Sequence, residues 1–352
     1  MNHQAFTFLR ELLDHPGPSG FEQRPSAVWR TQAETFADEV TRDVLGNSYA
    51  RLARQGHPVA VIEGHIDEIG FMITHIDEQG FLWFDRIGGW DIQVLLGQRV
   101  LIMGSSGDVV GVIGRKAAHI LEESEQNRVP PIRELWIDIG AANREEALQR
   151  VQIGDPAVLD AAFRQLTDDR IVSRGLDNRV GAFVALEALR NLSAKSPAID
   201  VFALAATQEE VSFAGAFTAT YSLKPAVAVV IDVTHATDYP NADKRLNGEV
   251  TIGGGPVLSR GASLNPVAYK MIRATAEQEG IAYQLQGAPR SSGTDADAMI
   301  KVASGVATVL VSIPNRYMHS PNELVSLNDL EQAARLIAAF LSTVDERTDF
   351  RP

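Results

Sequence analysis

Two adjacent glutamates, Glu209 and Glu210, follow an apolar run at residues 201–206 that is typical of a buried strand. Two acids side by side in a strand would point to opposite faces, so one of them would be buried without a partner at a cost of several kcal/mol. A strand end or a bound cation removes this cost. If Glu210 binds a cation, Glu209 can accept a proton from a water beside it. The pair therefore indicates a general base next to a metal ligand.

Other imidazole and carboxylate side chains lie just beyond, or between, the predicted buried elements: His65, Asp67, Asp177, Asp232 and His319. The chain has no cysteine, so any metal must be held by histidine and carboxylate groups, the set that suits Zn²⁺, Co²⁺ or Mn²⁺. Residues at the carboxyl ends of strands in an open α/β sheet could converge on one crevice. A carboxylate shared between two ions would make such a site dinuclear.

Each of these residues also has a purely structural explanation. A lone histidine such as His65 is more often a satisfied core or surface residue than a ligand. Asp177 could cap the helix that follows it, and Asp232 could begin a turn. The two glutamates could lie on a solvated loop. Only when the residues are considered together does a metal site explain them as well as these structural roles do.

Three further features of the sequence are better explained by structural roles than by function. Residues 294–296 favour a helix start with Thr294 or Asp295 as the N-cap. The glycines at 253–255 predict a turn, because no G-x-x-x-x-G-K-S/T pattern accompanies them. His75, His119 and His235 are predicted to be ordinary surface histidines, with His235 the least certain because it lies three residues past Asp232.

The sequence pattern changes between residues 71 and 163, where short apolar runs alternate with glycine turns and few segments show helical periodicity. This pattern predicts a small β-barrel or sandwich. The flanking parts, 1–70 and 164–352, alternate apolar runs with helical stretches, which favours a mixed or parallel sheet covered by helices on both faces. The predicted fold class is therefore α/β, with an inserted β domain at 71–163.

Individual elements follow from the same periodicities. Helices are expected at residues 5–13, 26–40, 180–192, 213–222, 265–279, 295–302 and 326–344. Strands outside the inserted domain are expected at residues 59–62, 201–206, 227–231, 282–286 and 307–313.

The overall composition excludes several classes of function. The 352 residues carry a net charge of −13, from 32 basic and 45 acidic side chains, and show no Lys/Arg-rich run, so we expect no nucleic-acid partner. The absence of cysteine excludes disulfides, thiolate zinc sites and a cysteine nucleophile. No signal peptide and no apolar run near the ~20 residues of a membrane span are evident, which predicts a cytoplasmic protein without a membrane partner.

Six short blocks, in order along nearly the whole chain, resemble those of the M42 aminopeptidases, the group of glutamyl aminopeptidase, tetrahedral aminopeptidase and the so-called cellulase M. They are GHIDEIGF at 64–71, GLDNR at 175–179, TQEEV at 207–211, IDV at 231–233, SGTDA at 292–296 and HSP at 319–321. The resemblance implies the zinc-peptidase-like α/β fold with an inserted dimerisation domain.

The resemblance also implies a dinuclear metal centre with two divalent ions per subunit, usually zinc or cobalt, with manganese as a third candidate. The position of Asp177 matches the ligand that bridges the ions. His65 and Asp232 match the ligands that complete one site, and Glu210 and His319 match those of the other.

Two residues take catalytic roles by the same resemblance. Glu209 matches the general base that accepts a proton from a water between the ions and delivers it to the leaving amine. Asp67 matches the residue that orients the His65 ring, in line with the rule that a ligating imidazole donates its other N–H to a carboxylate. The expected substrates are short peptides cleaved after their N-terminal residue. The expected assembly is a homo-oligomer built from dimers, with a tetrahedral dodecamer as one form.

Other functions remain open on the residues themselves. A metal-dependent deacylase or carboxypeptidase of the related superfamily would need cationic groups near the site, for which Arg179 and Arg290 are the candidates. A glycosidase would need two carboxylates roughly 5–9.5 Å apart and no metal. A non-catalytic protein that kept the fold is the third alternative.

Overall fold

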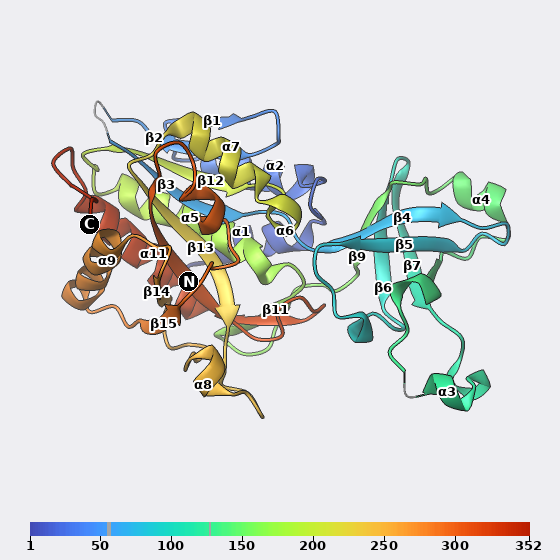
Figure 1. Cartoon of the computed structure of the whole chain (residues 1–352). Coiled ribbons are helices and arrows are strands. Elements are labelled where there is room, and N and C mark those ends of the chain that lie inside the picture. The colour runs from blue at the N-terminus through green and yellow to red at the C-terminus, as the bar shows by residue number, and fades with distance from the viewer. Residues whose placement is uncertain (55–57, 127) are drawn as a thin grey trace.

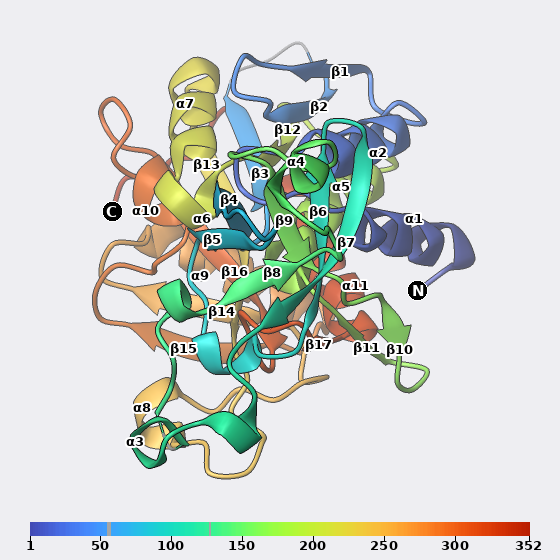
Figure 2. The same ribbon diagram turned by 90° about the vertical axis from the view of Figure 1, so that its right-hand side faces the viewer.

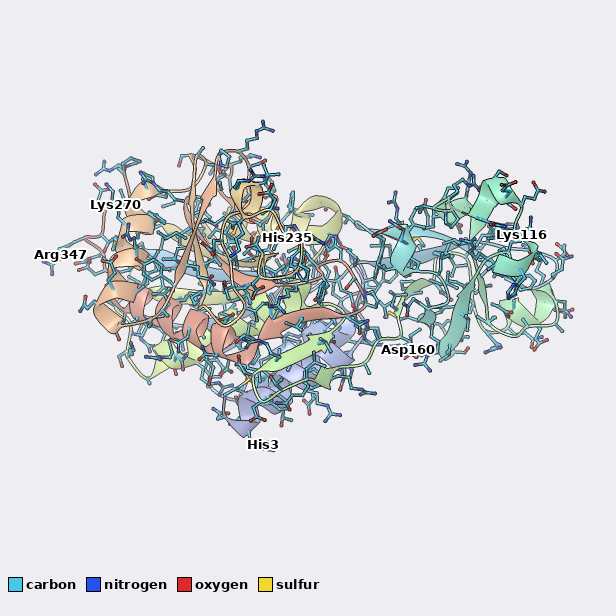
Figure 3. All side chains as sticks on the ribbon, turned by 90° about the horizontal axis from the view of Figure 1, so that it is seen from below. His3, Lys116, Asp160, His235, Lys270 and Arg347 are labelled. Atoms are coloured by element: carbon cyan, nitrogen blue, oxygen red, sulfur yellow. The ribbon has the colours of Figure 1, made fainter. Side chains whose placement is uncertain are left out.

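The computed structural model describes residues 1–54, 58–126 and 128–352, which form two bodies, a larger α/β body and a smaller β-barrel (Figure 1). The chain enters the barrel at β4 (Gly70–Ile76) and leaves it after β9 (Pro156–Leu159). Asp160, which follows β9, lies between the two bodies in Figure 3. An ion pair of 2.7 Å between Arg24 and Asp108 also joins them.

The α/β body is built on one mixed sheet. Across the described residues its strands follow the order β1 (Glu39–Arg42), β2 (Ser48–Leu52), β12 (Asp200–Ala206), β3 (Val59–His65), β13 (Val227–His235), β16 (Ala307–Asn315), β14 (Val257–Gly261) and β15 (Gln284–Ala288). The central strands β12, β3, β13 and β16 run parallel to one another. Their carboxyl ends therefore meet at one edge, where open α/β sheets bind their ligands.

Helices cover both faces of this sheet, because alternate residues of each strand point to opposite sides. One face packs against α1 (His3–Asp14), α2 (Gln23–Ala33), α5 (Leu176–Ser193), α9 (Pro266–Glu279) and α11 (Leu327–Ser342). The other packs against α7 (Ala214–Leu223) and α10 (Ala296–Met299), and Figure 2 shows these two across the sheet from α1 and α2. None of the helices in the described residues has the length and apolar character of a membrane span.

The barrel closes through strands in the order β4, β5 (Leu82–Ile87), β8 (Trp136–Asp138), β7 (Gly107–Gly114), β6 (Arg99–Gly104) and β9. Its interior is a separate apolar core that includes Phe71, Ile102 and Ile137. A small third sheet joins β10 (Arg164–Gln165), β11 (Arg170–Ser173) and β17 (Glu323–Ser326). The predicted fold class, a mixed sheet covered on both faces with an inserted β-barrel, is confirmed.

Short helical segments complete the chain: α3 (Glu123–Gln126), α4 (Arg144–Leu148), α6 (Glu209–Ser212), α8 (Lys244–Asn247) and the 3₁₀ turns η1 (Ile92–Val94), η2 (Ala118–Ile120) and η3 (Ile132–Glu134).

The predicted helix at 26–40 is wrong beyond Ala33, where α2 ends. Residues Glu39–Arg42 instead form β1, an edge strand whose side chains are largely exposed and whose backbone pairs with β2. An exposed edge strand lacks the apolar alternation that identifies a half-buried strand. The predicted helix at 295–302 is also shorter in the structure, where α10 spans Ala296–Met299.

Candidate functional site

His65 and Asp232 come from adjacent strands of the main sheet. His65 is the last residue of β3 and is buried. Asp232 is also buried, and it lies within β13, which continues to His235 instead of ending at residue 231 as predicted. Asp232 is therefore a strand residue and does not begin a turn. Both side chains point to the face that carries α7 and α10, because Val61, four residues before His65, and Val230, two residues before Asp232, pack there.

Glu209 and Glu210 lie on α6, just after β12. The chain leaves the strand at Ala206, turns at Gln208 with a left-handed φ of 60°, and begins α6 at Glu209. The two acids are therefore not in a strand, and both side chains are buried. The carboxylate of Asp67 accepts the backbone N–H groups of Glu209 and Glu210, each at 3.1 Å. Asp67 thus holds the turn that presents the two glutamates.

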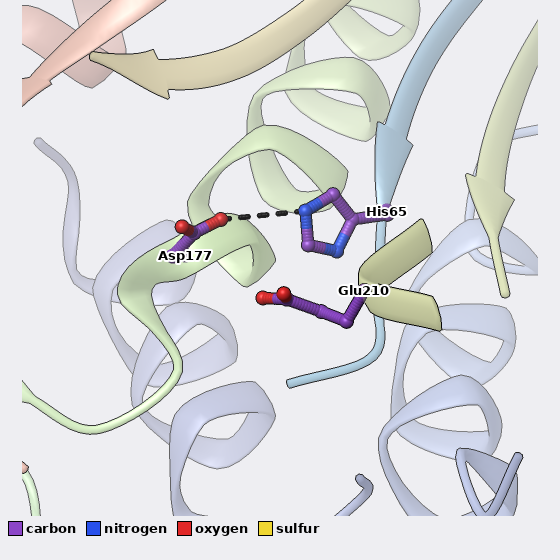
Figure 4. Close-up of side chains that lie close together, drawn as sticks. All are labelled: His65, Asp177 and Glu210. Atoms are coloured by element: carbon purple, nitrogen blue, oxygen red, sulfur yellow. Dashed lines mark ion pairs between the residues drawn. The ribbon is translucent and has the colours of Figure 1, made fainter. Parts of the chain in front are cut away.

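Asp177 lies between the two histidines. Its Oδ1 is 3.3 Å from Nε2 of His65, and its Oδ2 is 3.3 Å from Nε2 of His319. Figure 4 shows the contact with His65 and places Glu210 beside the pair. The capping explanation of Asp177 is wrong, because the side chain that caps the regular part of α5 is its neighbour Asn178, whose Oδ1 accepts the backbone N–H of Gly181 at 3.0 Å.

The other three acids, Glu209, Glu210 and Asp232, also lie close to the two histidines. His65 Nε2 lies 3.6 Å from Glu209 and 4.0 Å from Asp232, and His319 Nε2 lies 3.5 Å from Glu210. Ligand-type atoms within 4.8 Å of one another form two overlapping groups, one of His65, Asp177 and Glu210 and one of His65, Glu209 and Asp232. All the residues predicted for the site except Asp67 thus line one cavity of about 250 Å³.

The electrostatics of this cluster favour bound cations. Burial, together with neighbouring carboxylates, raises the pKa of Glu209 to about 10 and that of Asp232 to about 8. Burial alone would lower the pKa of His319, but its contacts with Asp177 and Glu210 raise it to about 11. The buried Oε1 of Glu210 accepts no hydrogen bond from the described residues, and its contact with Nε2 of His319 is an ion pair at 3.5 Å. Crowded buried acids with an orphaned oxygen fit a divalent metal, which neutralises them.

Asp67 contacts the His65 ring on its other side. Nδ1 of His65 is 3.4 Å from Oδ1 of Asp67 and 3.3 Å from its backbone oxygen. Burial alone would raise the pKa of Asp67, but its contact with His65 and the hydrogen bond from Ser19 lower it. The predicted contact between Asp67 and the ring is therefore present in the structure.

The barrel also reaches the site, through the glycines that follow β5. A Cβ atom placed on Gly89 would lie 3.3 Å from Nδ1 of His319. One placed on Gly88, whose φ is +76°, would lie 3.3 Å from Oε2 of Glu210. Trp90 fixes this loop, because its ring stacks on Phe71 and its indole N–H donates to the backbone oxygen of Gly70 at 3.0 Å. The backbone of the barrel thus forms one wall of the site.

The weaker sequence features have simple outcomes. His75 and His119 are exposed, as predicted. His235, on the α/β body in Figure 3, is also exposed, but it lines the cavity. The turn at 253–255 is confirmed, and its amides at Gly253 and Gly255 already donate to Asp329.

The helix start predicted at residues 294–296, with Thr294 or Asp295 as the N-cap, is confirmed. Asp295 occupies the N-cap position of α10 but makes no capping hydrogen bond. Thr294 acts there instead, since its Oγ1 accepts the backbone N–H of Ala296 at 3.2 Å. Asp295 is buried near Glu63, and that burial and charge raise its pKa well above the usual range.

The cationic residues needed by a carboxypeptidase are not available. Arg179 is fully buried, and its guanidinium donates to the carboxylate of Glu68 and to backbone oxygens that include those of Leu12 and His15. Arg290 is exposed and does not line the cavity. The structure therefore disfavours a substrate carboxylate at this site.

Glu22→Gln is expected to stabilise the protein at pH 8. Oε1 of Glu22 accepts the N–H groups of Gly20 and Gln208, and a glutamine oxygen can accept both. Burial, then the charge of Asp67, raises the pKa of Glu22 from 4.5 to about 7, so ionisation costs stability as pH rises through this range. The gain at pH 8 should reach up to about 3 kcal/mol and vanish near pH 4. Urea unfolding of the variant and the wild type at both pH values measures this difference in the free energy of unfolding. An equal difference at pH 8 and pH 4 would contradict the prediction.

Known proteins resemble this chain over most of its length. The family model of M42 glutamyl aminopeptidase matches residues 46–336. A lysyl aminopeptidase of Pyrococcus furiosus is 32% identical over 349 residues, which is 98% of each chain.

Solved structures agree with this match. The TET aminopeptidase of a marine sediment archaeon, Thaumarchaeota archaeon SCGC AB-539-E09, superposes with a TM-score of 0.93 at 34% identity and covers 97% of both chains. The TET1 peptidase of Pyrococcus horikoshii, which can assemble into a tetrahedron or a large octahedral shell, gives a TM-score of 0.84 at 31% identity over 95% of this chain and 98% of that one. The chain is thus a peptide hydrolase with N-terminal aminopeptidase function, and it belongs to the M42 glutamyl aminopeptidase family.

Proposed function

We propose that this aminopeptidase works with two divalent cations per subunit, zinc or cobalt in the first place and manganese as an alternative. The observation that carries the proposal is the position of Asp177, whose two carboxylate oxygens each face a different imidazole at 3.3 Å. Asp177 would be the shared ligand. His65 and Asp232 would complete one site, and Glu210 and His319 the other.

The ions, when bound, would supply Lewis-acid polarisation of the scissile carbonyl and would lower the pKa of a water. The residues supply the rest. Glu209 is the general base: its carboxylate accepts the proton of the attacking water and passes it to the leaving amine. Its position is set by Asp67, which accepts its backbone N–H at 3.1 Å. Asp67 also lies 3.4 Å from Nδ1 of His65, which orients the ring so that Nε2 faces the cluster.

The substrate enters as a peptide with a free α-amine. The cavity is small, about 250 Å³, and the free α-amine would lie in it near the ions and the carboxylates that line it. This restricts cleavage to the N-terminal residue. The names of the relatives include both lysyl and glutamyl aminopeptidases, so the preferred residue is best found by direct assay.

We expect metal-stripped protein to be inactive and to regain activity on p-nitroanilides when Zn²⁺, Co²⁺ or Mn²⁺ is added back. The assay uses the Leu, Glu, Lys and Ala derivatives, which identifies the cation and the preferred residue together. The same preparations are tested on a cellulose oligosaccharide. Amide hydrolysis that survives exhaustive chelation would contradict the metal mechanism, and chelator-resistant glycoside hydrolysis would favour the glycosidase alternative.

The assembly we propose is a homo-oligomer of dimers in which the inserted domain, residues 71–163, forms the contact between subunits. Its strand β7 exposes Val110 and Val112, which are 53% and 44% accessible in the isolated chain. The tetrahedral and octahedral shells of the TET1 peptidase give the same expectation. Light scattering would refute it by showing a single 38.2 kDa subunit in solution.

A further inference from the structure

Glu323 is a buried acid on β17 that touches the site only through backbone groups. Its Oε2 accepts the backbone N–H of Asp177 at 2.8 Å, and its Oε1 accepts the backbone N–H of His319 at 2.8 Å. Glu323 is 2% exposed, and it does not line the cavity. One carboxylate thus binds the main chain of the two residues that face each other across the proposed metal site.

The two backbone segments that Glu323 holds come from distant parts of the chain. Asp177 lies 146 residues before Glu323, and His319 lies four residues before it. His319 has a φ of +59°, a left-handed conformation that a residue with a Cβ atom adopts only when its surroundings hold it there. The short sequence separation alone would not keep His319 directed at Asp177.

The fold places Glu323 accurately for this task. Strand β17 pairs antiparallel with β11, and Glu323 lies directly opposite Ser173, the last residue of β11. The chain then passes through Gly175 and reaches Asp177 within four residues. The register of this small sheet therefore determines the distance between the Glu323 carboxylate and the backbone of Asp177.

We propose that Glu323 is a positioning residue for metal binding, which fixes Asp177 and His319 relative to each other by accepting a backbone N–H from each. The proposal rests on the assignment of Asp177 and His319 as metal ligands. Asp67 does the same on the opposite side, where it accepts the N–H groups of Glu209 and Glu210. The proposed ligands Asp177, His319 and Glu210 are in this way tied by their main chains to two buried carboxylates.

A second buried acid provides a matched control. Asp329 accepts the N–H groups of Gly253 at 2.7 Å and Gly255 at 2.8 Å, so it makes the same kind of two-amide contact as Glu323. Asp329 does not line the cavity and contacts none of the proposed ligands through these bonds. If Glu323 served the fold alone, replacing either acid by its amide would have the same consequences.

The test compares Glu323→Gln with Asp329→Asn in metal-free, full-length protein. Glutamine keeps the size of the side chain but turns an NH₂ group toward one of the two N–H donors, so one contact is lost. We expect Co²⁺ affinity, measured by competition with a chelator, to fall by about 10–100-fold in Glu323→Gln. Asp329→Asn should keep wild-type affinity. The melting temperature of each metal-free variant reports the loss of stability separately from the loss of affinity.

The outcomes separate this proposal from the proposed function. Wild-type protein that binds no divalent metal would overturn the metal mechanism itself. Wild-type protein that binds two ions, beside a folded Glu323→Gln variant of equal affinity, would overturn only the positioning role. Equal losses of affinity in Glu323→Gln and Asp329→Asn would also overturn it. If Glu323→Gln does not fold, Glu323→Asp takes its place: it keeps the charge but is one methylene shorter, and wild-type affinity in that variant would refute the proposal.

Discussion

Glu209→Gln is expected to bind metal as the wild type does and to lose about 10²–10⁴-fold in kcat, the usual contribution of a general base. The amide has the shape of the acid but cannot accept the proton of the attacking water. The backbone contacts that hold Glu209 and Glu210 on Asp67 do not involve the substituted group, so the neighbouring ligand stays in place. Steady-state kinetics on the preferred p-nitroanilide and elemental analysis measure the two quantities on one preparation.

Two results would contradict this assignment. Near wild-type kcat would show that Glu209 is not the base. Loss of metal would show that Glu209 is itself a ligand, a real alternative because its carboxylate lies within the group formed with His65 and Asp232. Glu187→Gln serves as the control, since Glu187 is a mostly buried acid on α5 outside the cavity and should keep the wild-type kcat.

Asp177→Ala is expected to lose both ions and to reduce activity to background. Each of its oxygens faces one imidazole, so the substitution removes a ligand from both proposed sites at once. The measurement is the metal-to-protein ratio after dialysis, which should fall from two to near zero.

The matched variant for that experiment is Asp232→Ala. Asp232 contacts only His65 of the two histidines, so this change should remove one ion and leave the other. An unchanged ratio in Asp177→Ala would refute the bridging role. A ratio of one in both variants would mean that Asp177 serves a single site.

The strands that carry the site were predictable because each contains a short apolar run. The central strands β3, β12, β13 and β16 are buried along most of their length, and residues 59–62, 201–206 and 227–231 within them are apolar. The short strands of the periphery were not predictable. Strands such as β1 and β10 are exposed and polar, and they are strands only because a partner strand binds their backbone.

Residue type was enough to select the histidines and acids of the cluster. It did not identify the buried acid that accepts hydrogen bonds from their backbone N–H groups. Histidines and acids at strand ends stand out in a chain without cysteine. Glu323 does not, because it is one acid among many and its partners are backbone N–H groups, one of which lies 146 residues away. The sequence signal that could have drawn attention to it is a lone acid directly before the apolar pair Leu324 and Val325, at the start of a buried strand.

The loop at Gly88 and Gly89 has a consequence for engineering. It belongs to the barrel by connectivity, but a Cβ atom at either glycine would lie only 3.3 Å from Glu210 or His319 of the other body. A chimaera that takes its barrel from a relative would therefore also import part of the catalytic chamber. Any side chain at either glycine in the donor would crowd Glu210 or His319, the proposed ligands of the recipient, so this loop has to stay with the host sequence when the rest of the barrel is exchanged.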